Sequence, residues 1–422
     1  MCQKKNCTKC KSDSDMVFIA TNPGIGTTGP TTPVCPPNPP LPSDNEVIMF
    51  KQNKHGFLDD IHHEKTGGLG TGPGLTFCED PLCSQGSLTV STSKKLVFVV
   101  NAGDANAGAT GPANGTVSSM KVSHDKLKKV DVVDSGGVFP CSVATYGDLL
   151  YVLNGGANTN VVAFKIKSDG KLENLGVKGT FNYVPMDNGQ PALFIGALIG
   201  PAQVKFTLDG KKLIVDVKDN TLSLDSPRGS FYVFDVQSNG DLTNMVKNDS
   251  SGYTPWGFDI YKNYLISTEL FGQDLNGIDP FGQGALSSYR INSNNTLTPI
   301  SVSIPSGQST PCWIARYEKY FYLCNSRFLP GSVSIYKINS QGELVMWQAV
   351  GYETTNHVVE VASLDNQLYL LCPGSTEYTS GLVDGALHVL DIDRHSGYLT
   401  LKQIINVTKP LSGLQGIATL KF

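Results

Sequence analysis

The sequence has no long hydrophobic stretch and carries little charge. No apolar run approaches the roughly 18–20 residues that a membrane-spanning helix needs, and charged residues make up 17% of the chain. The net charge of −4 comes without a basic stripe, so we expect no nucleic-acid partner. Residues 1–10 are polar and basic without an apolar core. We therefore expect no signal peptide, and we predict a protein of the cytoplasm or one incorporated into a virus particle.

Familiar sequence motifs of catalysis are absent as well. The chain contains no glycine-rich phosphate-binding loop, no nucleophile elbow and no zinc-protease motif. Cys7 and Cys10 have the spacing of half a zinc site or of a disulfide clip, but no second pair matches them. We predict that the protein uses no cofactor and holds no metal.

The ten cysteines fall into two groups. Cys141, Cys312, Cys324 and Cys372 lie within or beside apolar runs, which favours small buried side chains. Most of the others lie outside the predicted strands, and disulfide bonds among them would staple loops together once the protein is oxidised. The candidates for such a loop clip are Cys7, Cys10, Cys35, Cys78 and Cys83.

What the sequence does contain is a repeated unit of four short strands. In Ser309–Trp347, runs with period-two alternation of apolar residues are separated by turns with Gly, Asn and Ser, which is typical of antiparallel strands. The third strand and the turn after it recur at residues 161–172 and 230–242. Further copies, two of them weaker, lie at residues 47–58, 117–127, 286–297 and 387–399. The turns carry Gly or Asn because a tight hairpin needs a positive φ.

The seven copies predict an all-β fold, a seven-bladed β-propeller of four-stranded antiparallel blades. After a cysteine-bearing tail at residues 1–16, residues 17–422 form one domain. The chain begins on a second strand and ends in an apolar run at residues 413–420. We expect this C-terminal strand to complete the first blade, which removes an open edge. The proline-rich segment 23–45 is expected to be a loop inserted in the same blade.

Long insertions are concentrated at equivalent places of the repeat. They lie between second and third strands, as at residues 103–114, or between blades, as at residues 65–86 and 176–200. Up-and-down topology places both kinds of connection on one face of the disc. Because insertions gathered on one face mark a binding side, we predict that this long-loop face contacts protein partners or a second copy of the chain.

Several phrases of the chain resemble the lactonase-type seven-bladed propellers, the family of 6-phosphogluconolactonase and carboxymuconate-cyclising enzymes. The matching phrases are GPAQVKFTLDGK at residues 200–211, YTPWGF at 253–258, STE at 267–269 and PSGQSTPCW at 305–313. The resemblance extends over nearly the whole chain and implies the propeller fold, with this chain as a divergent member.

Enzymatic members of that family have a His, a Glu and an Arg around the mouth of the channel. Glu269 stands in the place of the Glu, at the end of a second strand. The His is missing, since residues 200–203 read Gly-Pro-Ala-Gln, and the Arg expected directly after Asn325 is displaced by one residue to Arg327. The resemblance implies Glu269 and Arg327 as the catalytic residues of lactone chemistry, as proton-transfer group and cation.

Seven further side chains are predicted at this channel mouth, because they begin innermost strands or end second strands. Trp256 and Trp313 follow prolines at equivalent places of the repeat, so they are either packing residues or platforms for a ligand. The full set is Asn154, Gln203, Trp256, Trp313, Asn325, His357 and Gln415.

Two functions are consistent with these features. The first is a non-catalytic binding or structural protein that acts through the long-loop face, within a larger assembly such as a virus particle. The alternative is a hydrolase or cyclase of small sugar-acid lactones that uses Glu269 and Arg327. An enzyme predicts a polar pocket where those two side chains converge, whereas a scaffold predicts a plugged or featureless channel.

Overall fold

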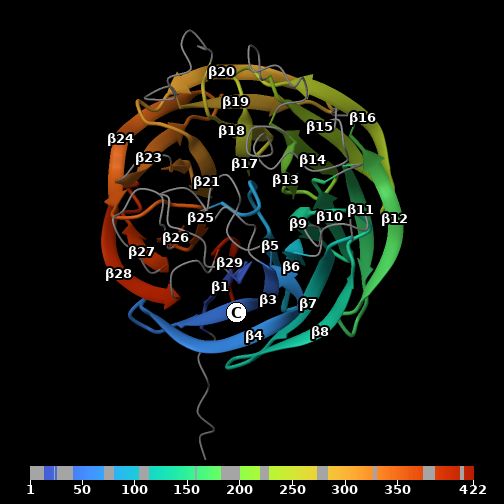
Figure 1. Cartoon of the computed structure of the whole chain (residues 1–422). Coiled ribbons are helices and arrows are strands. Elements are labelled where there is room, and N and C mark those ends of the chain that lie inside the picture. Colours follow the sequence, from blue (N-terminus) through green and yellow to red (C-terminus); the bar gives the residue numbers. More distant parts are fainter. Residues whose placement is uncertain are drawn as a thin grey trace, which may run out of the picture.

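The computed structural model is a ring of seven twisted sheets around a central axis (Figure 1). In the part of the chain that it describes, the regular elements are all β-strands, as the alternation of apolar residues predicts. That part comprises residues 14–22, 24–25, 41–70, 80–103, 114–156, 159–181, 200–218, 228–272, 284–326, 330–373, 385–408 and 413–422.

Six of the sheets are blades of four consecutive antiparallel strands. Blade 2 contains β5 (Leu88–Ser91), β6 (Leu96–Asn101), β7 (Thr116–Val122) and β8 (Leu127–Asp134). Blade 3 contains β9 (Pro140–Tyr146), β10 (Leu149–Asn154), β11 (Asn160–Ile166) and β12 (Leu172–Thr180). Blade 4 contains β13 (Pro201–Phe206), β14 (Lys212–Val217), β15 (Ser230–Val236) and β16 (Leu242–Asp249).

The next three blades repeat the same order. Blade 5 contains β17 (Pro255–Tyr261), β18 (Tyr264–Glu269), β19 (Ala285–Ile291) and β20 (Leu297–Pro305). Blade 6 contains β21 (Pro311–Tyr317), β22 (Tyr320–Asn325), β23 (Gly331–Ile338) and β24 (Leu344–Thr354). Blade 7 contains β25 (Glu360–Leu364), β26 (Gln367–Cys372), β27 (Gly385–Ile392) and β28 (Leu399–Thr408).

Blade 1 joins the two ends of the propeller, which confirms the predicted closure. Its strands are β29 (Ile417–Leu420), β1 (Met16–Ala20), β3 (Leu41–Gln52) and β4 (Leu58–Gly70), and β2 (Gly24–Ile25) pairs with β3. Residues far apart in the chain are direct neighbours, since Phe18 pairs with Ala418 in the antiparallel register. The C-terminal strand thereby gives this blade its innermost strand.

Two predicted boundaries in blade 1 differ from the structure. The C-terminal strand begins at Ile417 and not at residue 413, because Gly413 and Gly416 have positive φ values that interrupt an extended chain. The predicted loop 23–45 is partly strand, since β2 and the start of β3 fall inside it. Extended proline-rich chain has dihedral angles close to those of a strand, so it can pair where a partner lies beside it.

The turn between the third and fourth strands has the predicted chemistry and also links the blades. Its residue with positive φ is Gly56, Gly170, Gly240, Asn295, Gly342 or Gly397 in blades 1 and 3–7. The carbonyl oxygen of each accepts a hydrogen bond of 2.6–3.0 Å from the preceding blade. The respective donors are Gln367, Ser119, Tyr151, Asn248, Ser288 and Tyr322.

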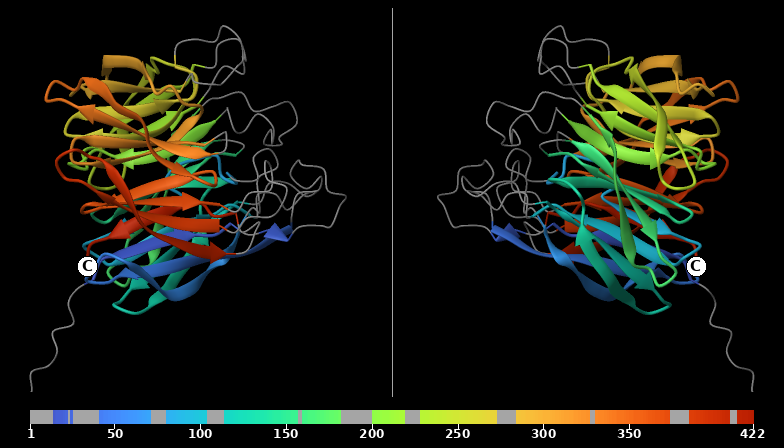
Figure 2. Two further views of the ribbon diagram at one scale, coloured as in Figure 1. Left: turned by 90° about the vertical axis from the view of Figure 1, so that its left-hand side faces the viewer. Right: turned by 90° about the vertical axis from the view of Figure 1, so that its right-hand side faces the viewer.

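Figure 2 shows the disc from its rim, with the strands of the blades running between its two faces. Innermost strands begin, and second and fourth strands end, on the long-loop face. Each segment between described strands that the structure leaves undescribed has both its ends on this face. The opposite face carries short connections, such as residues 147–148 and 262–263, and we name it the short-turn face. The described residues include no helix with the length and apolarity to span a bilayer.

We expect removal of β29, by ending the chain after Gly416, to lower the melting temperature sharply. The truncation uncovers the edge of β1 and removes Ile417 and Leu420, which are 5% and 0% exposed, at a cost of about 4 kcal/mol or more. Circular dichroism melts would measure the loss. Lys421→Ala is the matched control, because Lys421 makes an exposed ion pair with Asp365. A truncated chain that melts with the wild type would contradict the closure argument.

Candidate functional site

The long-loop end of the central channel is closed by the chain itself. Residues 80–87, which lead from blade 1 into β5, run across the middle of the ring (Figure 1). We call them the plug segment. Leu82 and Ser84 are 2% and 0% exposed, so this irregular segment is packed as tightly as a strand.

The plug segment is held by several blades. The Gln85 side chain donates to the Ile314 carbonyl at 2.8 Å and accepts from the Ile314 amide at 3.1 Å. The Ser84 carbonyl accepts from Trp313 Nε1 at 2.8 Å and from Gln415 Nε2 at 2.9 Å. Further bonds reach Cys141 of blade 3, Ala202 and Lys218 of blade 4 and Glu360 of blade 7. Satisfying these buried backbone groups fixes the segment in place.

Glu269 is a buried carboxylate and does not line the channel. Its side chain is 0% exposed and accepts hydrogen bonds from the Gly252 amide at 2.9 Å and from Ser303 Oγ at 2.5 Å. Burial raises the pKa of Glu269, while hydrogen bonds from Ser287 and Ser303 oppose that shift. Ser287 and Ser303 lie in the outer strands β19 and β20 of blade 5, and Gly252 lies in the connection that leads into β17. The carboxylate is therefore held by groups other than those that line the channel.

The position of Glu269 is a repeated structural slot. The residue that ends the second strand pairs with an inner-strand proline in blades 3, 5 and 6, as Asn154, Glu269 and Asn325 do. Asn325 Nδ2 donates to Ser334 Oγ at 2.9 Å, and Asn154 Nδ2 donates to Asn160 Oδ1 at 2.9 Å. These side chains bind the third strand and therefore do not reach the channel mouth.

Trp256 and Trp313 pack against each other, with ring centroids 6.2 Å apart. Both are buried, at 3% and 1% exposure, which supports their reading as packing residues. His357 is 3% exposed and its Nδ1 pairs with the Ser326 carbonyl. Gln415 holds the plug segment through both side-chain atoms, accepting from the Leu82 amide at 2.8 Å.

Several predicted residues lie outside the described part of the chain. Arg327 is one of them, so its approach to Glu269 stays a prediction. The same holds for Cys7, Cys10, Cys35 and Cys78. Cys83 is a free thiol whose Sγ lies 3.4 Å from the Asp80 carbonyl. Cys141, Cys312, Cys324 and Cys372 are buried free thiols, as predicted.

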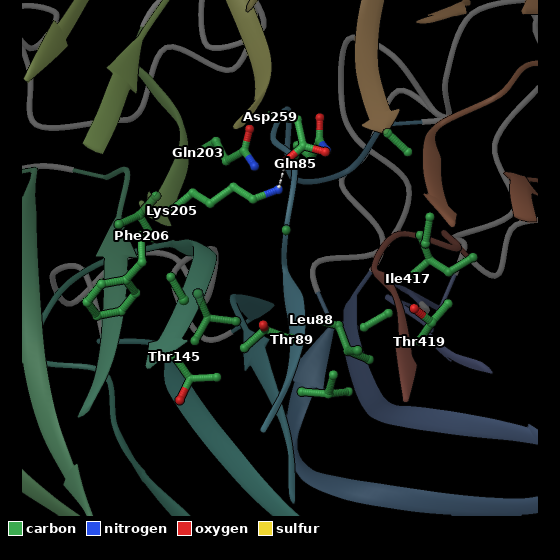
Figure 3. A pocket seen from close by; sticks show the side chains of 18 of the residues that line it. Gln85, Leu88, Thr89, Thr145, Gln203, Lys205, Phe206, Asp259, Ile417 and Thr419 are labelled. Carbon is green, nitrogen blue, oxygen red and sulfur yellow. Dashed lines mark hydrogen bonds and ion pairs between the residues drawn. The ribbon is translucent and has the colours of Figure 1, made fainter. Parts of the chain in front are cut away.

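Below the plug segment lies a cavity of about 440 Å³ that extends along the axis to the short-turn face (Figure 3). Gln85, Gln203 and Glu360 lie at its closed end, and Tyr146 and Leu208 lie at its rim. The innermost strands contribute small side chains to its wall, among them Thr89, Ala144, Ala315, Ala362 and Ala418. The cavity therefore stays open where these small side chains line it.

Two charged side chains replace those small residues on blades 4 and 5. Lys205 Nζ reaches across to Asp259 Oδ1 at 2.6 Å (Figure 3). The Lys205 side chain is 36% exposed and the Asp259 side chain 15%. Gln203 precedes Lys205 by two residues on the same strand, so both side chains leave the same face.

Glu360 is the buried acid of this cavity. It is 2% exposed, and its Oε1 accepts from the Gly86 amide at 2.7 Å. Oε2 makes no hydrogen bond with any described residue. Burial raises the pKa of Glu360 to about 8, against the opposing effect of the Gly86 and Gly416 amides. Burial therefore favours the protonated form of this acid, and a raised pKa in a cavity is a mark of functional sites.

Sequence analysis did not single out Lys205, Asp259 and Glu360. Their signal was available, because they are charged residues inside innermost strands, and Lys205 and Asp259 stand where other blades have alanine or threonine. In the described ranges, no group of three His, Cys, Asp or Glu side chains is placed to hold a metal ion.

Comparison with solved structures shows the fold. A candidate 6-phosphogluconolactonase of Bacteroides fragilis is 17% identical, with a TM-score of 0.60 over 97% of this chain and 99% of that chain. The periplasmic gluconolactonase of Pseudomonas aeruginosa is 15% identical, with a TM-score of 0.59 over 95% and 99%. No family model and no curated protein matches the chain. The predicted resemblance to lactonase-type propellers is thus confirmed at the level of the fold.

The two tryptophans provide a matched test of the plug segment. Trp313 Nε1 donates to the Ser84 carbonyl, whereas Trp256 Nε1 makes no hydrogen bond with any described residue. We expect Trp313→Phe to be more destabilising than Trp256→Phe by about 1 kcal/mol, since only the former loses a bond. Urea unfolding would measure both. Equal losses would show that the Trp313 bond does not hold the plug segment.

The acid at the closed end predicts a pH dependence of stability. An acid with a raised pKa keeps its proton in the folded state after the unfolded chain has released it. The free energy of unfolding therefore falls between the ordinary pKa of 4.5 and about 8, by about 1.4 kcal/mol per pH unit. We expect Glu360→Gln to lack this contribution, so its stability relative to wild type rises with pH. Urea unfolding across that range would test this, and parallel pH slopes would contradict it.

Proposed function

We propose that this chain is a non-catalytic binding protein built on the lactonase-type propeller fold, and that its long-loop face engages a protein partner or a second copy. The observation that carries the proposal is the plug segment, which fills the channel at the end where the family's enzymes are expected to react. A closed, rigid disc with its insertions on one face is suited to binding a macromolecule there.

The carboxylate implied for catalysis supports the same proposal. A proton-transfer group must come within hydrogen-bonding reach of a substrate, but the buried Glu269 oxygens already accept hydrogen bonds from the Gly252 amide and from Ser303 Oγ. Ala202 stands at the position where the resemblance implies a His in the family's enzymes. Its carbonyl accepts a hydrogen bond from the Gln85 amide at 3.0 Å. The plug segment therefore covers the strand start from which a catalytic side chain would project.

The competing proposal is a lactone hydrolase or cyclase that uses Glu269 and Arg327. Its support is the shared fold with proteins described as 6-phosphogluconolactonase and gluconolactonase. At 14–17% identity this likeness supports a shared fold. One fold serves many activities, so it does not by itself support a shared activity. We also propose that the protein is part of a larger assembly, such as a virus particle.

We expect purified protein to hydrolyse gluconolactone and 6-phosphogluconolactone no faster than buffer, and Glu269→Gln to behave identically. A pH-stat would record the acid that ring opening releases. Hydrolysis by the wild type that Glu269→Gln abolishes would overturn the non-catalytic proposal.

Sedimentation velocity on the same samples tests the binding part of the proposal. We expect species heavier than the 45.3 kDa chain, or a complex with a recovered partner. A strict monomer without any partner would contradict it.

A further inference from the structure

We propose that the central cavity is a binding site for a small amphipathic carboxylate, held by Lys205 and Gln203 on one side and by a wall of alanines on the other. The cavity opens on the short-turn face, away from the long-loop face and from Glu269. The inference therefore stands independently of the proposed function, and either can fail alone.

The cavity has the size and shape of a small-molecule site. Its volume of about 440 Å³ lies within the roughly 300–1,000 Å³ that such sites occupy. The plug segment closes one end, and rigid strands from all seven blades form the wall. A ligand entering from the short-turn face would lose most of its water and meet groups that are already positioned.

Hydrogen-bond donors are left over at the closed end. Lys205 Nζ gives one hydrogen to Asp259, and the described residues offer no partner for the other two. Gln203 Oε1 is occupied by the Phe258 amide at 2.7 Å, while its Nε2 bonds to no described residue. An ionised carboxylate accepts from both an ammonium and an amide, and such charge-assisted bonds are the stronger kind.

The charges in the cavity favour an anion over a cation. Lys205 and Arg316 line it with positive charge and Asp259 with negative charge. Glu360 adds none while it is protonated. One positive charge in excess matches a monocarboxylate better than a doubly charged phosphate ester.

The rest of the wall selects an apolar body. Ala144, Ala315, Ala362 and Ala418 present methyl groups from four blades, and Tyr146 stands at the rim with 47% exposure. Burying an apolar group against these surfaces adds affinity in proportion to the area removed from water. A flat or short-chain acid such as benzoate combines both requirements.

Isothermal titration of the full-length protein with benzoate tests the site, with benzamide as the neutral probe of the same shape. We expect saturable binding of benzoate, weakened about tenfold or more in Lys205→Met, which removes the cation. Ala362→Leu fills part of the cavity without changing any charge, and we expect a similar loss of benzoate affinity. Lys178→Met is the matched control, because Lys178 makes a comparable ion pair of 2.7 Å with Asp241 outside the cavity; binding should change by less than about twofold.

Circular dichroism melts of each variant establish that it is folded before titration. The site is refuted if benzoate gives no saturable heat with the wild type, or if both Lys205→Met and Ala362→Leu bind it as tightly as the wild type does. Benzamide binding as strongly as benzoate would overturn the carboxylate class. A loss in Ala362→Leu together with a loss in Lys205→Met and none in Lys178→Met would support the proposal.

Discussion

The architecture depends on a hydrogen bond that crosses from one blade to the next. A Ser, Tyr, Asn or Gln side chain donates to the carbonyl of a turn residue with positive φ, and this occurs at six of the seven junctions. A left-handed residue turns its carbonyl out of the hairpin ladder, so the turn that reverses the chain also offers an acceptor to its neighbour. Local turn chemistry thereby sets how the blades pack around the axis.

The junction that lacks this bond is the one from which the plug segment arises. Between blades 1 and 2 the turn at residues 123–126 has no glycine, and other described bonds join the two blades. Among them, Ser118 Oγ donates to the Thr66 carbonyl at 3.0 Å and the Lys129 amide donates to Glu64 at 3.0 Å. The connection from β4 to β5 leaves the rim and crosses the channel, where it ties blades 3, 4, 6 and 7 to the closing strand. Links through the centre thus arise at the junction where the described residues lack the bond to a turn carbonyl.

The ring could be predicted because each blade repeats the alternation and turn residues that build it. Closure followed from the chain ends, although Gly413 and Gly416 shorten the final strand. The plug segment could not be predicted, because residues 80–87 have no periodicity and their partners, Ile314 and Gln415, lie 229 and about 331 residues further along. The charged residues of the cavity stood in predicted innermost strands, but which of them meet depends on the ring geometry.

Glu269 shows why a motif match in a repeat protein needs the structure. The slot at the end of the second strand binds a hydroxyl of the third strand in several blades: Asn101 donates to Ser118, Asn325 to Ser334, and Glu269 has Ser287 as its partner. A carboxylate in that slot satisfies the same packing requirement as an amide. Its presence in a family phrase is therefore explained by the repeat alone, whereas Lys205 and Asp259 occupy places where the other blades have small residues. Departures from a repeat carry more information about function than agreement with it does.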